Sequence, residues 1–485
     1  MIYFLEGHDR GTALQELLIS LLPDEEHVSA QTPPPGGVDF ILSHAEMDGN
    51  RVAVHCTVRR GGLSTSASAQ EGWSGGELER RRALTHAVKD SAYRALLPHL
   101  AEKPAWGGMT GVKPAKPVRL ALERGLPPQQ AEGFLQKRYD VDPKRSAIAA
   151  ECASEAEKCL KMLDSKEIQL YVGIPFCPAK CRYCSFVSND VKRFGALVEP
   201  YLEALHAEIA AAGQALTGAG YHVGSLYIGG GTPTTLAAGQ LDRLLDGLHR
   251  AFDFRSCREK TVEAGRPETI SRERMAVCAQ WGVGRVSVNP QTMRDDVLAA
   301  VGRCHTADDI RRAYADVRAA GNFIVNMDLI AGLPGDDAEG LLSSVRQVSE
   351  LEPENITLHS LALKKGAQLR FGPRGVLDRE TVDQCHELLR AGGWRPYYLY
   401  RQKYIAGGLE NVGFCKGETA SFYNVCMMEE IGSVAALGAG GVTKLCGGGK
   451  IRRVANPKYP LEYIRERERI IARAASLDEK GAPGR

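Results

Sequence analysis

Three closely spaced cysteines are the residues in this sequence that point most directly to chemistry. Cys177, Cys181 and Cys184 follow a C-x3-C-x2-C pattern on a loop that also contains Pro175 and Pro178. Thiolates are soft ligands that bind zinc, Cu(I) or iron–sulfur clusters. Structural zinc needs four closed ligands, and no second Cys pair or His pair stands at a matching distance. A [4Fe–4S] cluster on three cysteines would keep one iron open; three unrelated buried thiols are the alternative.

A glycine run forms a second candidate site. The segment Gly229-Gly230-Gly231-Thr232-Pro233 follows an apolar, strand-like run. Residues without Cβ allow the backbone to approach a ligand closely, so that free N–H and C=O groups can bind it. A tight turn would use the same residues. We expect a binding loop, because the run stands at a strand end, as the cysteine loop does.

Single polar residues close or follow the later strand-like runs. Glu263 stands at such an end, where burial of a carboxylate without a partner would be costly. It could accept hydrogen bonds from a ribose or an ammonium group, and a surface salt bridge is the alternative. Gln291, Arg303 and Asp328 offer further donors and acceptors for a nucleoside or a carboxylate.

Strand-like and helical segments alternate from residue 167 onward, which predicts successive βα units around a parallel sheet. Six such units favour an open, partial (β/α)6 TIM-like barrel over the full eight. Active sites in such barrels lie at the C-terminal ends of the strands, and every motif above follows or closes a strand. The predicted strands are Ile168–Ile174, Val223–Ile228, Thr261–Ala264, Arg285–Val288, Phe323–Ile330 and Ile356–Leu361.

The chain is predicted to have three regions: residues 1–150 as an N-terminal α+β accessory region, 151–365 as the core barrel, and 366–485 as a C-terminal, substrate-side α+β region. The first region is expected to contain a number of elements of its own. These are a strand at Ile2–Leu5, a helix with leucines at 14, 17, 18 and 21 and Thr12 as N-cap, a break at 33–37, a strand pair at 38–43 and 51–58 around Asp48-Gly49, and a helix from Glu77 to about Leu100. Trp106, in a Gly- and Pro-rich segment followed by basic residues, predicts a segment that docks onto the next domain rather than a plain linker. Binding of an acidic ligand is the alternative.

The composition excludes several classes of protein. The 485 residues are too many for one core, and 44% hydrophobic with 25% charged residues is normal for a globular protein. A net charge of +2 gives no argument for nucleic acid or a membrane as partner. The first residues lack a signal-peptide pattern and no apolar run is long enough to span a bilayer. Thirteen scattered cysteines do not form a disulfide framework, so we expect a cytoplasmic protein.

The cysteine pattern resembles the signature of the radical S-adenosylmethionine (SAM) superfamily. Four segments occur in the order of one branch, the oxygen-independent coproporphyrinogen III dehydrogenases, and the resemblance covers about residues 168–445. The long N-terminal region, with the segments 400–403 and 409–413, resembles the HemZ-type variant. The four segments are Tyr171–Cys177, Gly229–Pro233, Val286–Gln291 and Asn326–Pro334, followed by a glycine-rich element at Ala436–Thr443.

The resemblance implies a [4Fe–4S] cluster on Cys177, Cys181 and Cys184 that reduces SAM to methionine and a 5′-deoxyadenosyl radical. The radical takes a hydrogen from the β-carbon of a propionate, and loss of CO2 and an electron leaves a vinyl group. Two rounds turn coproporphyrinogen III into protoporphyrinogen IX for porphyrin and haem biosynthesis, with an electron donor such as flavodoxin or ferredoxin. The family's contacts to the cluster-bound SAM are matched by position at Tyr171, Gly230, Glu263 and Val442. Its contacts to a second SAM are matched at Tyr183, Gly231, Thr232, Gln291, Arg303, Asp328 and Ala362.

Two positions depart from the family pattern, and other functions use the same core. The family often has His in place of Gly173, and a fourth cysteine in place of Phe186. A related group of haem chaperones resembles His-Asn-x-x-Tyr-Trp in the C-terminal region, where this chain has Tyr423-Asn424-Val425-Cys426-Met427-Met428. Another radical SAM reaction on a tetrapyrrole, and a scaffold with an inert cluster, are the remaining alternatives.

Overall fold

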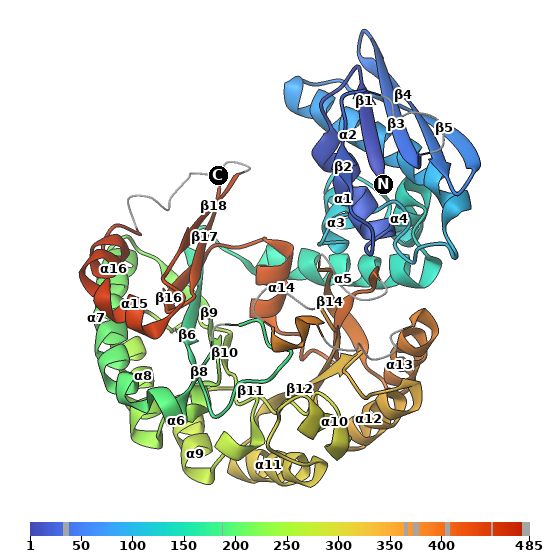
Figure 1. The fold of residues 1–485 in the computed structure, drawn as a ribbon. Helices are drawn as coiled ribbons and strands as arrows, with labels where there is room; N and C mark the ends of the chain where they lie inside the picture. The colour runs from blue at the N-terminus through green and yellow to red at the C-terminus, as the bar shows by residue number, and fades with distance from the viewer. Residues whose placement is uncertain are drawn as a thin grey trace. The chain divides into compact units, whose positions relative to one another are not determined.

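The computed structural model divides the chain into two compact units (Figure 1). The N-terminal unit comprises Met1–Ala150 with Arg401–Leu409, and the barrel unit comprises Glu151–Tyr400 with Glu410–Arg485. The residues described are 1–32, 38–186, 188–362, 367–371, 378–402, 408–447 and 450–477. The predicted break at 33–37 lies outside them. Among the helices described, none is long and apolar enough to cross a membrane.

The N-terminal unit is a five-stranded sheet in the order β2-β1-β3-β4-β5. β1 pairs in parallel with β2 and β3, whereas β3, β4 and β5 form antiparallel hairpins. The predicted strand pair is confirmed, with Asp48 opposite Arg51 across the turn. The strands are β1 (Ile2–Glu6), β2 (Val28–Ser29), β3 (Phe40–Asp48), β4 (Arg51–Arg60) and β5 (Leu63–Gly72).

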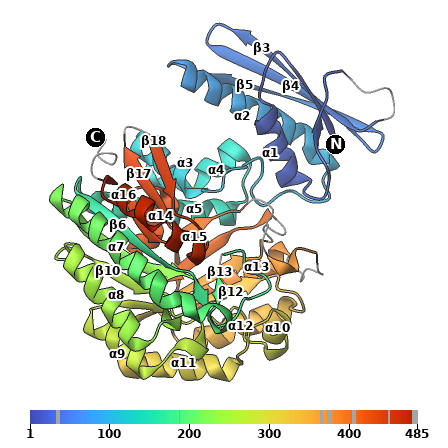
Figure 2. The same cartoon turned by 60° about the vertical axis from the view of Figure 1, so that its left-hand side comes forward.

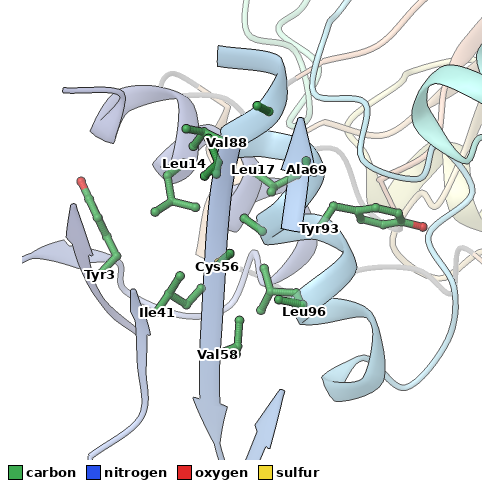
Figure 3. Packing of buried hydrophobic residues seen from close by; sticks show 14 of the residues in the cluster. Tyr3, Leu14, Leu17, Ile41, Cys56, Val58, Ala69, Val88, Tyr93 and Leu96 are labelled. Carbon is green, nitrogen blue, oxygen red and sulfur yellow. The ribbon is translucent and has the colours of Figure 1, made fainter. Parts of the chain in front are cut away.

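Two helices, α1 (Gly11–Leu21) and α2 (Glu77–Leu96), pack on this sheet. The leucines of α1 are buried against α2 and the strands, as Figure 3 shows for Leu14 and Leu17. The prediction of Thr12 as N-cap is wrong, because the helix already begins at Gly11 with Arg10 at the N-cap position and no side-chain cap. Pro98 lies in a 3-10 turn after α2, so that α2 ends at Leu96 and not near Leu100.

The rest of the N-terminal unit is helical, with α3 (Ala115–Glu123), α4 (Ala131–Tyr139) and the first part of α5 (Pro143–Met162). Trp106 is buried in this unit, and the guanidinium of Arg401 lies 5.4 Å from the centre of its ring. Arg401 also donates to the carbonyl of Met109 at 2.6 Å. Arg401 therefore packs as part of the N-terminal unit, although it follows a strand of the other unit in the chain.

The barrel unit contains an eleven-stranded sheet, in which the six predicted strands are parallel and neighbour one another in chain order. The predicted partial (β/α)6 barrel is confirmed. A seventh parallel strand, β16, extends it beside β6, and antiparallel strands finish both edges. The strands are β6 (Glu167–Ile174), β9 (His222–Gly230), β10 (Glu259–Val262), β11 (Arg285–Ser287), β12 (Ile324–Ala331), β13 (Asn355–Ser360), β14 (Arg395–Tyr400), β15 (Asn411–Cys415), β16 (Val434–Gly438), β17 (Val442–Gly447) and β18 (Lys450–Ala455).

Helices cover the outer face of the curved sheet, as both views show (Figures 1 and 2). Their apolar positions face the strands; the leucines at 241, 244, 245 and 248, for example, are all buried. These helices are α7 (Val198–Gly218), α8 (Ala238–Ala251), α9 (Arg272–Gln280), α10 (Asp295–Ala300), α11 (Ala307–Ala320), α12 (Ala338–Glu350) and α13 (Arg379–Ala391). Two further helices, α15 (Pro460–Arg465) and α16 (Arg467–Ala474), pack on α7, whereas α14 (Phe422–Glu429) contacts β9 and β14.

The inner face of the sheet is unusually polar and aromatic. In closed barrels of this class, branched apolar side chains fill the inside. Here alternate positions along the strands carry groups that bond to one another; Ser225 donates to Gln169 at 2.5 Å, and Thr357 donates to Asn326 at 3.0 Å. Such a lining is costly unless each group finds a partner, and it is suited to a polar ligand.

A buried carboxylate anchors the C-terminal strands and helices to α7. Glu208 accepts hydrogen bonds from the amide of Gly438 (2.7 Å), the side chain of Asn456 (2.9 Å) and the hydroxyl of Tyr463 (2.5 Å). Burial raises the pKa of Glu208, against these three bonds that lower it. Because the three donors come from β16, α15 and the segment between them, this one side chain joins the elements that follow the barrel.

We expect Glu208→Ala to lower the free energy of unfolding by about 2–4 kcal/mol, because it leaves buried donors without a partner. Chemical denaturation of the variant and of Glu203→Ala, an exposed neighbour on the same helix, measures the difference. Equal stability of the two variants would contradict this role of Glu208.

Candidate functional site

The three cysteines lie on the loop that follows β6. Within this loop, β7 (Phe176–Cys177) pairs in parallel with β8 (Asn189–Asp190), which closes the loop into a compact turn. Cys181 is buried, whereas Cys177 and Cys184 are half-buried. The hydroxyl of Thr232 donates to the sulfur of Cys177 at 3.4 Å. The loop therefore holds its sulfurs against the strand ends with partial access to solvent.

Two buried arginines favour the thiolate of Cys181. Arg266 donates to its sulfur at 2.9 Å. Burial opposes ionisation of Cys181, but the charges of Arg303 and Arg266 outweigh it, so that the pKa of this thiol is lowered. Burial raises the pKa of Cys177, and that of Cys184 to about 11. Metal ligands must be deprotonated, and Cys181 is the thiol prepared for this.

The donor set fits an iron–sulfur cluster better than a single ion. Among the described residues, no three His, Cys, Asp or Glu side chains converge on one ion-sized point. A [4Fe–4S] cluster binds each thiolate through a different iron, and three thiols spread over one loop match that requirement. Several buried polar atoms nearby have no partner in the described part of the chain, which leaves them for a ligand: Arg266 Nη2, Arg303 Nε and Gln291 Oε1.

The glycine run supports the cysteine loop directly. The amide of Gly231 donates to the carbonyl of Ile174, and that of Thr232 to the carbonyl of Phe176, both at 2.7 Å. A Cβ at Gly231 would lie 2.5 Å from the Phe176 oxygen, so glycine is required for this approach. We expected these amides to be free for a ligand, and that expectation is wrong, because they bond the backbone beside the cysteines.

Glu263 lies just beyond the end of β10 and faces the glycine run. It accepts the hydroxyl of Tyr227 at 2.6 Å and the amide of Gly230 at 3.2 Å. Burial raises the pKa of Glu263 to about 7; the Tyr227 bond lowers it, the charge of Asp328 raises it, and the Gly230 amide lowers it. The ring of Tyr171 stacks on that of Tyr227 at 6.3 Å. Three predicted contact residues, Tyr171, Gly230 and Glu263, are thus brought together.

A second group lies around the loop after β11. Gln291 has a left-handed backbone (φ 71°), and its amide donates to the carbonyl of Asp328 at 2.9 Å. Arg303 is buried and donates to the carbonyls of Asn289 and, at 3.0 Å, of Gly265. The structure therefore also brings Gln291, Arg303 and Asp328 together.

Asp328 lies inside β12 and not at its end, because the strand continues to Ala331. It accepts Asn326 at 2.7 Å and lies 3.7 Å from the His359 ring. Burial opposes ionisation, but His359 and Asn326 prevail and lower the pKa of Asp328.

The remaining predicted residues are placed less centrally. Tyr183 packs beside Cys181 against an apolar cluster that includes Leu361. Ala362 follows β13 at the same end of the barrel. Val442 begins β17, and its side chain is 42% exposed. The contacts predicted for these residues stay predictions.

Gly173 has a structural reason to differ from the family pattern. A Cβ there would lie 2.6 Å from the carbonyl oxygen of Ala439, where β6 and β16 run side by side. The hydroxyl of Tyr201 joins the two strands, because it accepts a hydrogen bond from the Ala439 amide at 2.9 Å and donates one to the Gly173 carbonyl at 2.5 Å. A larger residue at position 173 would therefore require the backbone at Ala439 to shift.

Arg266, Tyr227 and His359 are site residues that the sequence interpretation missed. Tyr227 and His359 stand at inward positions of their strands, and the alternation of side chains along a strand could have indicated them. Arg266 lies on a loop three residues after Glu263, where no spacing rule applies; only its contact with Cys181 reveals it.

Comparison with known proteins gives the family. The model of the radical SAM superfamily matches residues 171–348. The "oxygen-independent coproporphyrinogen-III oxidase-like protein HemZ" of Bacillus subtilis is 35% identical over 398 residues, which are 80% of this chain and 79% of the relative. The chain belongs to this radical SAM family. A radical SAM protein uses a [4Fe–4S] cluster and SAM, so the open-iron interpretation of the cysteine loop is the family's own chemistry.

Two other relatives mark the range of the family. The "heme chaperone HemW" of Haemophilus influenzae is 29% identical over 306 residues, 61% of this chain and 76% of the relative. The coproporphyrinogen III oxidase structure (HemN) of Escherichia coli has a TM-score of 0.52 at 22% identity and covers 64% of this chain and 71% of that one. The structural likeness supports the barrel fold, and the two names leave the reaction of this radical SAM protein to be argued from its site.

The raised pKa of Glu263 predicts a pH effect on stability. The pKa of this carboxyl is about 7 in the folded protein and has its ordinary value of 4.5 in the unfolded chain. The proton on Glu263 therefore stabilises the folded state fully below about pH 4.5, and this stabilisation is lost as the pH rises through 7. Relative to Glu263→Gln, the unfolding free energy of the natural protein should fall by about 2.5 kcal/mol between pH 5 and 8. Denaturation at several pH values, with exposed Glu273→Gln as control, measures this; parallel curves for the natural protein and Glu263→Gln would contradict it.

Proposed function

We propose that the chain catalyses the oxygen-independent conversion of coproporphyrinogen III to protoporphyrinogen IX, as a step of porphyrin and haem biosynthesis. The similarity to HemZ over most of both chains supports this choice of substrate. The observation that carries the proposal is the meeting of Cys181, Arg266 and the Tyr227–Glu263–Gly230 bonds at the strand ends. These groups provide a thiolate site and a nucleoside-type site side by side.

The residues have separate tasks in this proposal. Cys177, Cys181 and Cys184 hold the cluster, and Tyr171, Gly230, Glu263 and Val442 hold the SAM that binds to it. With both bound, the pair supplies a 5′-deoxyadenosyl radical that removes one hydrogen atom from a substrate carbon. A second SAM, if the family pattern applies, takes the contacts of Tyr183, Gly231, Thr232, Gln291, Arg303, Asp328 and Ala362.

The overall reaction balances without a proton donor. Each propionate loses one hydrogen atom to the radical, one CO2 and one electron, and becomes a vinyl group. The electron released equals the one that cleavage of SAM takes up, and SAM becomes methionine and 5′-deoxyadenosine. The protein's part is therefore to bind, to orient and to exclude water. The polar groups on the inner face of the barrel are buried and bonded to one another, so they are suited to binding and orienting a ligand rather than to transferring protons.

A haem carrier is the second candidate, since HemW chaperones are among the relatives. The chaperone motif resembled His-Asn-x-x-Tyr-Trp, and this chain has Tyr423 where the His would stand. Tyr423 is buried, and its ring stacks on Tyr227 at 4.6 Å. This position therefore offers no imidazole to haem iron, which supports the enzyme over the carrier.

Anaerobic product analysis tests the reaction. The reconstituted protein, with reductant, SAM and coproporphyrinogen III, should form protoporphyrinogen IX with one 5′-deoxyadenosine and one CO2 for each propionate lost. Cys181→Ala should lose the iron–sulfur absorbance and SAM cleavage, whereas Cys304→Ala, an exposed thiol, should keep both. Deoxyadenosine without a porphyrin product would contradict the substrate, and tight haem binding without SAM cleavage would favour the carrier.

The surface around the cysteine loop supports an acidic one-electron carrier, such as flavodoxin or ferredoxin, as partner. Phe186, two residues after Cys184, is 69% exposed. Four basic side chains of the loop and of α6 (Val191–Phe194) are also exposed: Lys180, Arg182, Lys192 and Arg193. The acidic Asp190 between them is half-buried and caps α6. A positive surface around an exposed aromatic residue attracts an acidic protein and raises its association rate.

The double variant Lys192→Glu/Arg193→Glu should reduce the rate of cluster reduction by such a carrier by about tenfold at low salt. Reduction by dithionite should not change, since it needs no docking surface. Anaerobic stopped-flow absorbance measures both rates, and Arg272→Glu, whose side chain is 82% exposed on another helix, is the control. An unchanged rate with the protein carrier would exclude this surface.

A further inference from the structure

Two buried hydroxyl groups on the inner face of the barrel have no hydrogen-bond partner among the described residues. They are the hydroxyls of Ser287, which is 5% exposed, and of Tyr423, which is 4% exposed. A buried hydroxyl without a partner costs free energy relative to water. Neither residue was among the predicted contacts, so both ask for an explanation.

Ser287 lies next to Glu263 on the inner face. Val262 of β10 is in register with Val286 of β11, which places the following residues, Glu263 and Ser287, side by side. Residues two apart on a strand share a face, and Arg285 turns inward, where it lies 3.3 Å from Glu259. Ser287 therefore turns inward as well, beside the Glu263 carboxylate.

Tyr423 lies on the other side of Glu263. Its ring stacks on Tyr227 at 4.6 Å and 21°, and the hydroxyl of Tyr227 is the one that Glu263 accepts. Burial raises the pKa of the Tyr423 hydroxyl, and the nearby Glu263 carboxylate raises it further. The phenol thus reaches the group of residues that the resemblance assigns to SAM.

The backbone around Tyr423 is held in place by the carboxylate of Glu259. Glu259, at the start of β10, accepts the hydroxyl of Ser421 at 2.8 Å and the amides of Phe422 at 3.1 Å and Tyr423 at 3.4 Å. Glu259 is itself paired with Arg285. A carboxylate that caps α14 (Phe422–Glu429) on one side and meets an inward arginine on the other fixes the ring against Tyr227. The unpartnered hydroxyl is therefore not the result of a loose side chain.

We propose that Ser287 and Tyr423 are ligand contacts that complete, with Glu263, one hydrogen-bonding set for the ribose diol of SAM. A carboxylate has about four acceptor sites, and Tyr227 and Gly230 use two of those on Glu263. Each ribose hydroxyl both donates and accepts. The oxygens of Glu263 can accept hydrogen bonds from these hydroxyls, while the Ser287 and Tyr423 hydroxyls donate hydrogen bonds to the ribose oxygens. This assignment rests on the proposed use of SAM and adds two residues to it.

The test is binding of S-adenosylhomocysteine to the cluster-loaded full chain, measured by calorimetry in the absence of any tetrapyrrole. Tyr423→Phe keeps the stacked ring and Ser287→Ala keeps the strand, so each removes only an oxygen. We expect each variant to bind about five- to tenfold more weakly than the natural protein. With the 2′,3′-dideoxy analogue of the ligand, the three proteins should bind equally.

The melting temperature of the ligand-free protein gives a second, independent readout. Tyr423→Phe should melt at the same or a higher temperature, because it removes an unsatisfied buried group. Tyr463→Phe is the matched control, since its buried hydroxyl bonds Glu208 at 2.5 Å. This control should melt lower and bind the ligand normally. A purely structural role for Tyr423 would give the reverse pattern.

Three outcomes would overturn the inference. Unchanged affinity in both variants would show that neither hydroxyl contacts the bound ligand. An equal loss with the dideoxy analogue would place their contact elsewhere on the ligand. A lower melting temperature of Tyr423→Phe with normal affinity would make the hydroxyl structural. None of these results depends on turnover of coproporphyrinogen III, so a failure of the proposed reaction would remain distinguishable.

Discussion

The backbone hydrogen bonds between the glycine loop and the cysteine loop are the constraint on which the site depends. The amides of Gly231 and Thr232 hold the carbonyls of Ile174 and Phe176, and the absence of a Cβ at Gly231 lets the two chains come that close. The same short segment supplies the Thr232 hydroxyl to Cys177 and the Gly230 amide to Glu263. One glycine-rich turn therefore sets the distance between the thiol loop and the carboxylate.

Burial of charge at these strand ends would be costly without the compensations that the structure shows. Arg266 and Arg303 are buried cations beside the thiol of Cys181, and a thiolate there offsets part of their desolvation. Among the described residues, no cation pairs with Glu263, and burial raises its pKa to about 7. The two halves of the site thus differ in polarity: buried cations surround the cysteines, whereas aromatic rings and a carboxyl group that ionises only near neutral pH lie around Tyr227. A ligand with a carboxylate at one end and hydroxyls at the other fits that polarity.

The elements after the barrel contribute more to the site than their position in the chain suggests. β16 extends the parallel sheet beside β6, and this requires the contact of Gly173 with Gly438 and Ala439. α14 brings the ring of Tyr423 onto that of Tyr227. Tyr423 stands where the pattern of the haem chaperones has its histidine. In this chain, the C-terminal segment thus places a buried phenol inside the barrel.

The sequence by itself determined the repeating βα pattern and the open six-unit barrel, because these depend on strand and helix periodicity. Local spacing also singled out the three cysteines that are proposed to hold the cluster. It also determined that Glu263, Gln291 and Asp328 lie toward one end of the barrel, since parallel strands all end on one edge. Only the tertiary structure decided which partner each group has. Arg266 reaches Cys181 across 85 positions of the chain, and Tyr227 reaches Glu263 across 36. The glycine amides turned out to bond the cysteine loop rather than stay free, and Thr12 lay inside a helix that began earlier. Such contacts depend on the packing of distant segments, which no local pattern encodes.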